Sequence, residues 1–199
     1  DPVNCIVRDD SGDYYKAPLN CSGNIYVENV TFISTSQDGT SYDIPSYAVH
    51  ADTAGVGTMY FKNCTMTSYQ SSAIGIGLHQ DQTLILDNCT LLKASEYDGG
   101  ALYVHNAVAN NTTNQHLIVK NCHISTTHSF AVKVDDANTY AGGTNSQMDM
   151  LFINNICYSD TKGKTDVIWF RDTPINGGVS GQIKLKADSF GNNVQELNS

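Results

Sequence analysis

Leu84-Ile-Leu-Asp-Asn-Cys-Thr-Leu91 is the clearest copy of a phrase that recurs along this 199-residue chain and decides its fold. Each copy has an alternating apolar run, an asparagine and a second apolar pair. The asparagines of the five copies are Asn29, Asn63, Asn88, Asn121 and Asn155, at steps of 25 to 34 residues. An internal repeat with a period of about 20 to 50 residues is the signature of a solenoid or an array.

Each phrase predicts two short strands joined by a sharp corner. Apolar residues alternate before the asparagine, as at Leu84 and Leu86, and resume one position out of phase behind it, as at Cys89. Alternation of period two indicates strands. Asparagine suits the corner because it tolerates left-handed backbone angles, and asparagines stacked in successive coils form a hydrogen-bonded ladder. In the fifth copy this phase directs inward Leu151, Ile153, Ile156 and Tyr158.

A second alternating segment lies between the first ones in each repeat. The five segments span residues 48–52, 73–79, 101–105, 131–135 and 167–171. Loops rich in Gly, Ser, Thr, Asn and Asp separate the strands, and no segment has the period of an amphipathic helix. Equivalent strands of successive coils then lie parallel and in register. The sequence therefore predicts an all-β fold, a parallel β-helix.

The asparagine phrase and the coil length over residues 25–172 resemble the right-handed parallel β-helix superfamily typified by pectate lyases and phage tailspikes. The resemblance implies a single-stranded right-handed solenoid of about five to six coils. We expect one domain over residues 1–199, with residues 1–24 as an N-terminal turn and residues 173–199 as a C-terminal strand or cap. The superfamily contains lyases, hydrolases, esterases and non-catalytic adhesins, so the fold does not fix the function.

The low content of charged residues and the negative net charge limit the classes of partner that we expect. Only 16% of residues are charged and the net charge is −9 at pH 7. No basic run is present to neutralise phosphates, so we expect no nucleic-acid partner. No apolar stretch approaches the roughly 20 residues that span a bilayer, and no signal peptide is present, so we expect no membrane insertion. This composition suits a module of a longer extracellular, cell-surface or virion protein.

Five of the six cysteines fall into two groups. Cys64, Cys89 and Cys122 directly follow their asparagines and form one inward column of small apolar side chains. No histidine or carboxylate interrupts this column, so we expect no metal there. The chain contains no cofactor-binding motif, so we expect no cofactor. Cys5 and Cys21 lie near the N-terminus, where a bridge between them and two free thiols are both open.

The outer face of the first strands carries two rows of side chains. Opposite charges alternate along one row, which is a stabilising ladder: Glu28, Lys62, Asp87, Lys120 and then Asn154. The other row is an apolar stripe of Tyr26, Tyr60, Ile85, Ile118 and Phe152. Exposed apolar patches of this extent mark interfaces. We expect a long loop, a neighbouring domain or further copies of the chain, as in a homotrimer, to cover the stripe.

The outer face of the second strands has a different character. Its residues are His50, Asp52, His79, Tyr103, His105, Lys133, Asp135, Trp169 and Arg171. Aromatic rings with polar edges, next to carboxylates and hydrogen-bond forks, fit sugar rings and their hydroxyls. Gly75 and Gly77 remove two side chains from the middle coil, so we expect a groove there. The first predicted function is therefore recognition of a polysaccharide along this face, with Trp169 and Tyr103 stacking on sugar rings.

Two other functions stay open. One is a polysaccharide hydrolase, lyase or esterase in the same groove, with His105 and Asp135 as the acid–base pair. His79 and Asp52 are further catalytic candidates. The other is a structural or oligomeric fibre segment, in which the polar face is ordinary solvated surface and the apolar stripe makes the contacts. The catalytic phrases of pectate lyases, polygalacturonases and pectin esterases are missing from the sequence, which places recognition first.

Overall fold

Three parallel sheets make up the protein. The computed structural model describes residues 5–9, 17–35, 47–52, 55–69, 71–95, 99–107, 114–135, 146–160, 166–171 and 183–197. These residues form nineteen strands and no helix. The strands assemble into sheets A, B and C, and every pairing in them is parallel. None of the described elements is a helix that could cross a membrane.

Each sheet takes every third strand of the chain. Sheet A contains β1 (Cys5–Asp9), β4 (Val30–Ser34), β7 (Thr65–Ser68), β10 (Thr90–Lys93), β13 (His123–Thr126), β16 (Ile156–Asp160) and β19 (Asn193–Leu197). Sheet B contains β2 (Leu19–Asn20), β5 (Val49–Ala51), β8 (Ile74–Leu78), β11 (Leu102–Asn106), β14 (Val132–Asp135) and β17 (Ile168–Arg171). Sheet C contains β3 (Ile25–Glu28), β6 (Gly57–Lys62), β9 (Gln82–Asp87), β12 (Asn114–Lys120), β15 (Ser146–Ile153) and β18 (Ile183–Phe190).

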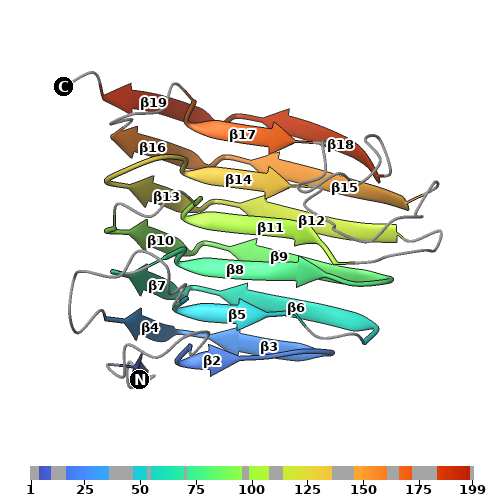
Figure 1. The fold of residues 1–199 in the computed structure, drawn as a ribbon, viewed down its shortest axis with the longest axis horizontal. Coiled ribbons are helices and arrows are strands. Elements are labelled where there is room, and N and C mark those ends of the chain that lie inside the picture. Colours follow the sequence, from blue (N-terminus) through green and yellow to red (C-terminus); the bar gives the residue numbers. More distant parts are fainter. Residues whose placement is uncertain are drawn as a thin grey trace, which may run out of the picture.

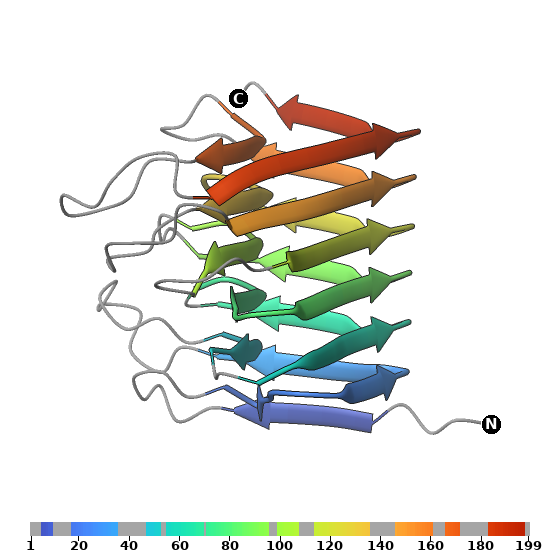
Figure 2. The same ribbon diagram turned by 90° about the vertical axis from the view of Figure 1, so that its right-hand side faces the viewer.

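The chain winds through the three sheets as one coil. After β1, six coils follow, each with one strand from sheet B, one from sheet C and one from sheet A. In Figure 1 the chain runs from left to right through sheet B at the front and returns behind it through sheet C as it rises. This is the right-handed sense that strand twist favours in parallel crossovers. Figure 2 shows the levels stacked from the N-terminus at the bottom to the C-terminus at the top. The predicted right-handed parallel β-helix is confirmed.

Left-handed residues mark the corners between sheets C and A. Asn29, Asn63, Asn88 and Asn121 have φ values between 52° and 59°, as predicted. The fifth corner is Asn154, with φ of 53°, so the prediction of Asn155 was wrong by one residue. The sequence reads Asn-Asn at this point, and either residue suits a left-handed corner. A sixth corner at Gly191, with φ of 64°, went unpredicted because glycine replaces asparagine there.

Because of this one-residue shift, the inward and outward residues of the fifth copy are exchanged. Phe152, predicted to lie in the outer stripe, is buried and pairs with Val119, while Leu151 pairs with Ile118 and takes its place in the stripe. The inward direction predicted for Leu151, Ile153, Ile156 and Tyr158 was therefore wrong. Ile156 is 46% exposed. Because side chains alternate along a strand, a slip of one position moves every residue to the other face.

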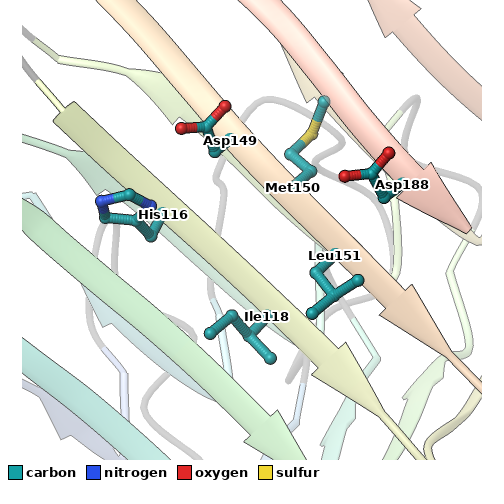
Figure 3. Close-up of a pocket in the computed structure, with 6 residues that line it drawn as sticks. All are labelled: His116, Ile118, Asp149, Met150, Leu151 and Asp188. Carbon is teal, nitrogen blue, oxygen red and sulfur yellow. The ribbon is translucent and has the colours of Figure 1, made fainter.

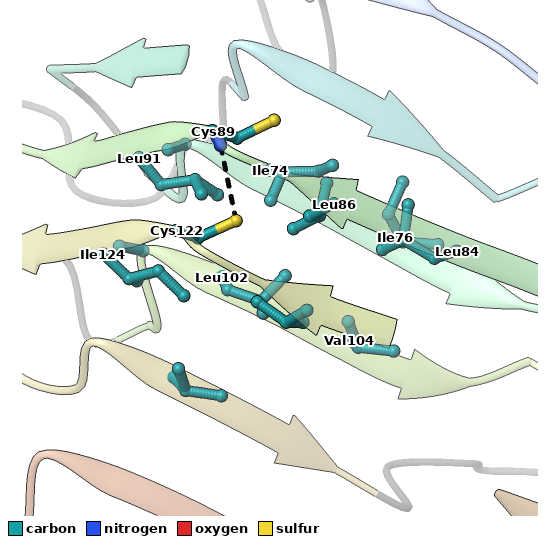
Figure 4. Packing of buried hydrophobic residues seen from close by; sticks show 14 of the residues in the cluster. Ile74, Ile76, Leu84, Leu86, Cys89, Leu91, Leu102, Val104, Cys122 and Ile124 are labelled. Carbon is teal, nitrogen blue, oxygen red and sulfur yellow. Dashed lines mark hydrogen bonds between the residues drawn. The ribbon is translucent and has the colours of Figure 1, made fainter. Parts of the chain in front are cut away.

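Inward side chains of the three sheets fill the interior of the coil (Figure 4). Equivalent residues stack directly above one another, as Leu84 stacks on Met59 and beneath Leu117. All three are almost completely buried. Burying one such side chain stabilises the fold by roughly 1.5–3 kcal/mol. The core is therefore continuous along the axis, and it holds the outward rows of each sheet in register.

The side chains that directly follow the corners at Asn88, Asn121 and Asn154 point into the coil, where they form a second hydrogen-bonded ladder. Asn155 Oδ1 accepts a hydrogen bond from Cys122 N at 2.9 Å, and Asn155 Nδ2 donates to Val119 O at 2.9 Å. One coil lower, Cys122 Sγ accepts from Cys89 N at 3.4 Å, and Cys89 Sγ donates to Phe61 O at 3.4 Å. A thiol is a weak donor and a weak acceptor. Between them, the thiols of Cys122 and Cys89 make the two kinds of contact to the coil below that the amide of Asn155 makes alone.

The cysteines are free thiols. Cys5 is exposed on β1, whereas Cys21 is buried beside sheet B, with its Sγ 3.8 Å from His50 O. Of the two alternatives left open for this pair, the structure has the unbridged one. Burial raises the pKa of Cys21 to about 11, so its thiol stays protonated at neutral pH.

Polar inward residues end the strands of sheet A, and sequence reasoning did not anticipate them. Ser34, Ser68, Lys93, Thr126 and Ser159 are all buried at this position. Lys93 Nζ donates to Ser95 O at 2.9 Å and to His128 O at 3.0 Å. A buried ammonium group requires such partners. Lys93 therefore holds two successive connections that lead from sheet A to sheet B.

The charged row on sheet C forms the ion pairs that its alternation predicts. Lys62 Nζ lies 3.0 Å from Glu28 Oε1, and Lys120 Nζ lies 2.9 Å from Asp87 Oδ2. Surface pairs of this kind each contribute less than about 1 kcal/mol. The asparagine ladder beside this row is formed in part, because Asn88 Nδ2 donates to Asn63 Oδ1 at 2.8 Å.

Candidate functional site

Two rows of outward residues cross sheet B at the front of Figure 1. Register gives the first row as Asn20, His50, Gly75, Tyr103, Lys133 and Trp169. It gives the second row as Gly77, His105, Asp135 and Arg171. Asp52 directly follows β5 and lies beside Gly77. The structure describes the backbone of Asp135 and Arg171 but not their side chains.

His79 does not share the second row, as the sequence had suggested, because Gly77 holds that place. It lies two residues further on, in the turn from sheet B to sheet C. Buried Gln82 fixes this turn: its Oε1 accepts from His79 N at 2.9 Å, and its Nε2 donates to Gly55 O at 2.6 Å. From the next coil, Gln115 Nε2 donates to Leu78 O at 2.6 Å. Two stacked glutamines thus set the direction of His79.

Side chains from neighbouring coils fill the spaces above Gly75 and Gly77. A Cβ atom at Gly75 would lie 2.5 Å from Cε1 of Tyr47. A Cβ atom at Gly77 would lie 2.6 Å from Asp52 Oδ1 and 2.9 Å from His105 Cε1. The expectation of a groove at the two glycines was therefore wrong. The glycines instead make room for the protein's own side chains to meet across the middle coil.

Asp52 lies between two histidines at this meeting point. Its Oδ1 is 2.9 Å from His79 Nε2, and its Oδ2 is 3.7 Å from His105 Nε2. The side chains of Asp52, His79 and His105 are 39%, 20% and 23% exposed, so solvent reaches all three. The three residues come from three successive coils. We call them the acid–histidine cluster.

A third histidine, His50, borders the cluster. Its ring stacks on Tyr47, with centroids 4.9 Å apart and an interplanar angle of 11°. Burial lowers the pKa of His50; the positive charge of His105 also lowers it, while the Asp52 carboxylate opposes this shift. His50 therefore resists protonation more than an ordinary imidazole does.

A cation and two aromatic rings continue the first row. Lys133 Nζ lies 5.4 Å from the ring centroid of Tyr103 and 5.0 Å from that of Trp169. The Trp169 ring stacks on Phe130 at 4.9 Å, and the Tyr103 ring stacks on His105 at 5.5 Å. Cation–π contacts favour an ammonium held in this way. The rings therefore already pack on side chains of the protein.

Tyr47 and Phe130 are site residues that sequence reasoning missed. They precede the strands of sheet B, at the position two residues before Val49 and Val132. A signal for them was present, because Tyr47-Ala-Val and Phe130-Ala-Val are two copies of one short phrase. Both rings cover an outward residue of sheet B, Gly75 in one case and Trp169 in the other.

The predicted catalytic pair of His105 and Asp135 are neighbours in register on β11 and β14. The carboxylate that the described side chains place beside His105 is that of Asp52. Within the described ranges, no group of three or more His, Cys, Asp or Glu residues has the geometry to hold a metal ion. The chemistry that the cluster offers is proton transfer and hydrogen bonding.

The outer face of sheet C carries the apolar stripe, corrected to Tyr26, Tyr60, Ile85, Ile118 and Leu151. Tyr26 is 56% exposed. A depression of about 190 Å³ lies at the far end of the stripe, and Figure 3 shows its lining. The lining residues are His116, Ile118, Asp149, Met150, Leu151 and Asp188. This face has an apolar floor with carboxylates at its rim, whereas sheet B gathers histidines and aromatic rings.

No family model, no curated protein sequence and no solved structure matches this chain.

Proposed function

We propose that the outer face of sheet B binds a polysaccharide. The acid–histidine cluster is the observation that carries the proposal, because three polar side chains from successive coils converge there and stay open to solvent. Carboxylates accept and imidazoles donate or accept hydrogen bonds. A sugar ring presents several hydroxyl groups a few ångströms apart, and such a convergent set can bind two or three of them at once.

The first row of sheet B supplies the second part of the proposed site. Because the Trp169 ring packs on Phe130 and lies near Lys133, we assign it a supporting role and not the open stacking platform expected from the sequence. Trp169 and Tyr103 would hold the Lys133 ammonium in position for a hydroxyl or carboxylate of the ligand. The positions of Arg171 and Asp135 would extend this polar surface to the last coil.

Strand spacing sets the length of ligand that fits. The site runs from Asp52 after β5 to Trp169 on β17, which is four steps along sheet B. With about 4.8 Å per step this is roughly 19 Å, the length of about four sugar units. We infer an extracellular, cell-surface or virion setting for such a module, supported by its weak charge and polar loops.

Acid–base catalysis at the same cluster is the second candidate function. It is favoured by the 2.9 Å separation of Asp52 Oδ1 and His79 Nε2, since a carboxylate that orients an imidazole is a common general-base arrangement. In this version Asp52 orients His79 or His105, in place of the predicted pairing of His105 with Asp135. The ligand would be the same polysaccharide, but the protein would cleave it and not only bind it.

One experiment separates the two candidates. The purified protein is incubated with a panel of neutral and acidic polysaccharides, and both retention and released oligosaccharides are measured by mass spectrometry. Retention without products, lost in Asp52→Asn and His79→Gln but kept in His123→Gln on sheet A, supports binding. Products that vanish in the same two variants support catalysis. If neither retention nor products depend on the cluster, both candidates fail.

An assembly role for sheet C is the remaining candidate, and the exposed stripe around Tyr26 is what favours it. Further copies of the chain, as in a homotrimer, or a neighbouring domain would cover the stripe. Light scattering on the wild type and on Tyr60→Asp/Ile118→Asp tests it. A wild type larger than a monomer that dissociates in the variant supports the interface, and a monomer in both cases excludes self-assembly.

A further inference from the structure

We propose that the acid–histidine cluster selects anionic groups of the bound glycan in a proton-dependent way, so that carboxylate or sulfate groups bind in mild acid and are released near neutral pH. This inference rests on the proposed function of sheet B. With His79 and His105 neutral, the cluster carries the single negative charge of Asp52. With both imidazoles protonated, it carries one positive charge.

The geometry allows both charge states. Asp52 meets the two imidazoles on different oxygens, so each can be protonated without displacing the other. All three side chains are partly exposed, so protons exchange with solvent. Histidine is the side chain whose unperturbed pKa lies between pH 5 and 8. Gly77 makes the arrangement possible, because any larger residue would push Asp52 out from between the histidines.

Other titratable groups border the cluster. On the β5 side, burial lowers the pKa of His50, so its protonation needs a lower pH than that of an ordinary imidazole. The phenol rings of Tyr47 and Tyr103 are neutral throughout. After His79, the Asp81 carboxylate accepts a hydrogen bond from Asn114 N at 3.4 Å.

Beyond His105, the next coil adds the Lys133 ammonium, which lies on the first row near the rings of Tyr103 and Trp169. Asp135 and Arg171 continue the second row by backbone register. The whole chain has a net charge of −9 at pH 7 and repels polyanions elsewhere. Protonation of the cluster therefore changes the sign of charge at the place where a polyanion would bind.

Dextran sulfate and unsubstituted dextran of equal length are the probes for this inference. Their affinities are measured at pH 5.5 and pH 7.5 at constant ionic strength. Two added surface charges should tighten dextran sulfate binding by about fivefold to tenfold at pH 5.5, with no such change for dextran. His79→Gln/His105→Gln should remove the pH dependence, and His123→Gln on sheet A should keep it. The proposal would be overturned if the ratio of dextran sulfate affinities at the two pH values were the same in these two variants. It would also be overturned if the wild type showed no pH dependence.

A ligand-free measurement keeps the proposal testable if the double variant does not fold. Proton NMR titration of the imidazole Cε1–H signals in the wild type and in Asp52→Asn follows the cluster directly. In the wild type two signals should shift between pH 7.5 and pH 5.5 that are missing from the spectra of His79→Gln and His105→Gln, one from each, and Asp52→Asn should change the chemical shifts of both because the neighbouring carboxylate is gone. The absence of such a pair contradicts the inference. The two proposals fail separately: pH-dependent dextran sulfate binding with no retained natural polysaccharide refutes glycan recognition and leaves a proton-dependent anion site.

Discussion

Asn155→Ala tests the buried ladder inside the wall. The substitution removes the acceptor of Cys122 N and the donor to Val119 O, which both lie 2.9 Å from the Asn155 amide. It also removes the donor to Asn192 Oδ1 at 2.8 Å, an oxygen that still accepts from Asn155 N. A buried polar group without a partner costs about 1–3 kcal/mol, so two such groups cost about 4 kcal/mol. In a domain of this size 1 kcal/mol shifts Tm by about 2–4 °C. We therefore expect Asn155→Ala to lower Tm by about 10 °C.

Asn155→Cys is the matched comparison, because the thiol of Cys122 makes the accepting contact and the thiol of Cys89 makes the donating one. Weaker bonds to sulfur should lower Tm by about 4 °C in place of about 10 °C. The assay is thermal unfolding followed by far-ultraviolet circular dichroism. Equal losses for alanine and cysteine would refute the view that a thiol replaces an amide here. A loss below about 2 °C for alanine would refute the energetic importance of the ladder itself.

Three further predictions concern the site and its support. Gly77→Ala should displace the Asp52 side chain and weaken polysaccharide retention, whereas Gly55→Ala, where a Cβ meets no atom within 4 Å, should bind as the wild type does. Lys93→Met should lower the free energy of unfolding in urea by about 2–4 kcal/mol, because two main-chain carbonyls lose their buried donor. The lowered pKa of His50 gives stability that is complete above about pH 6.5 and is lost as pH falls through the native pKa. Urea unfolding of His50→Asn should show a smaller loss between pH 7.5 and 5.5 than the wild type, and an equal loss contradicts this assignment.

The coil could be predicted from the sequence because a strand with one buried face requires alternating apolar residues, and a left-handed corner favours asparagine. Alternation predicts the strands. Asparagine occupies five of the six left-handed corners, and its predicted position is correct at four of them. The error at Asn155 had a detectable cause. The phase that directs Leu151 and Ile153 inward also directs Asp149 inward, and a buried carboxylate without a cation is costly. The opposite phase buries Phe152 and Met150.

The candidate site was predictable as a face but not as a set of contacts. Alternation in strands of sheet B places His50, Tyr103 and Lys133 outward without any structure. It says nothing of Tyr47, which reaches Gly75 from a connection. For the same reason it does not show whether the space above a glycine is open or filled. Contacts between coils depend on the paths of the connections, and their paths follow no period.

The length of one coil explains why the cluster forms where it does. Asn63 and Asn88 are 25 residues apart, the shortest step between corners, because the connections on both sides of β8 are short. The outward residues of β8 are Gly75 and Gly77, which have no side chains to fill the space above the strand. Asp52 from the coil before occupies the space at Gly77 and contacts His79, the first residue after β8, and His105 from the coil after it contacts Asp52. A longer loop or a larger residue in this coil would separate them, so the cluster is a consequence of the smallest coil in the solenoid.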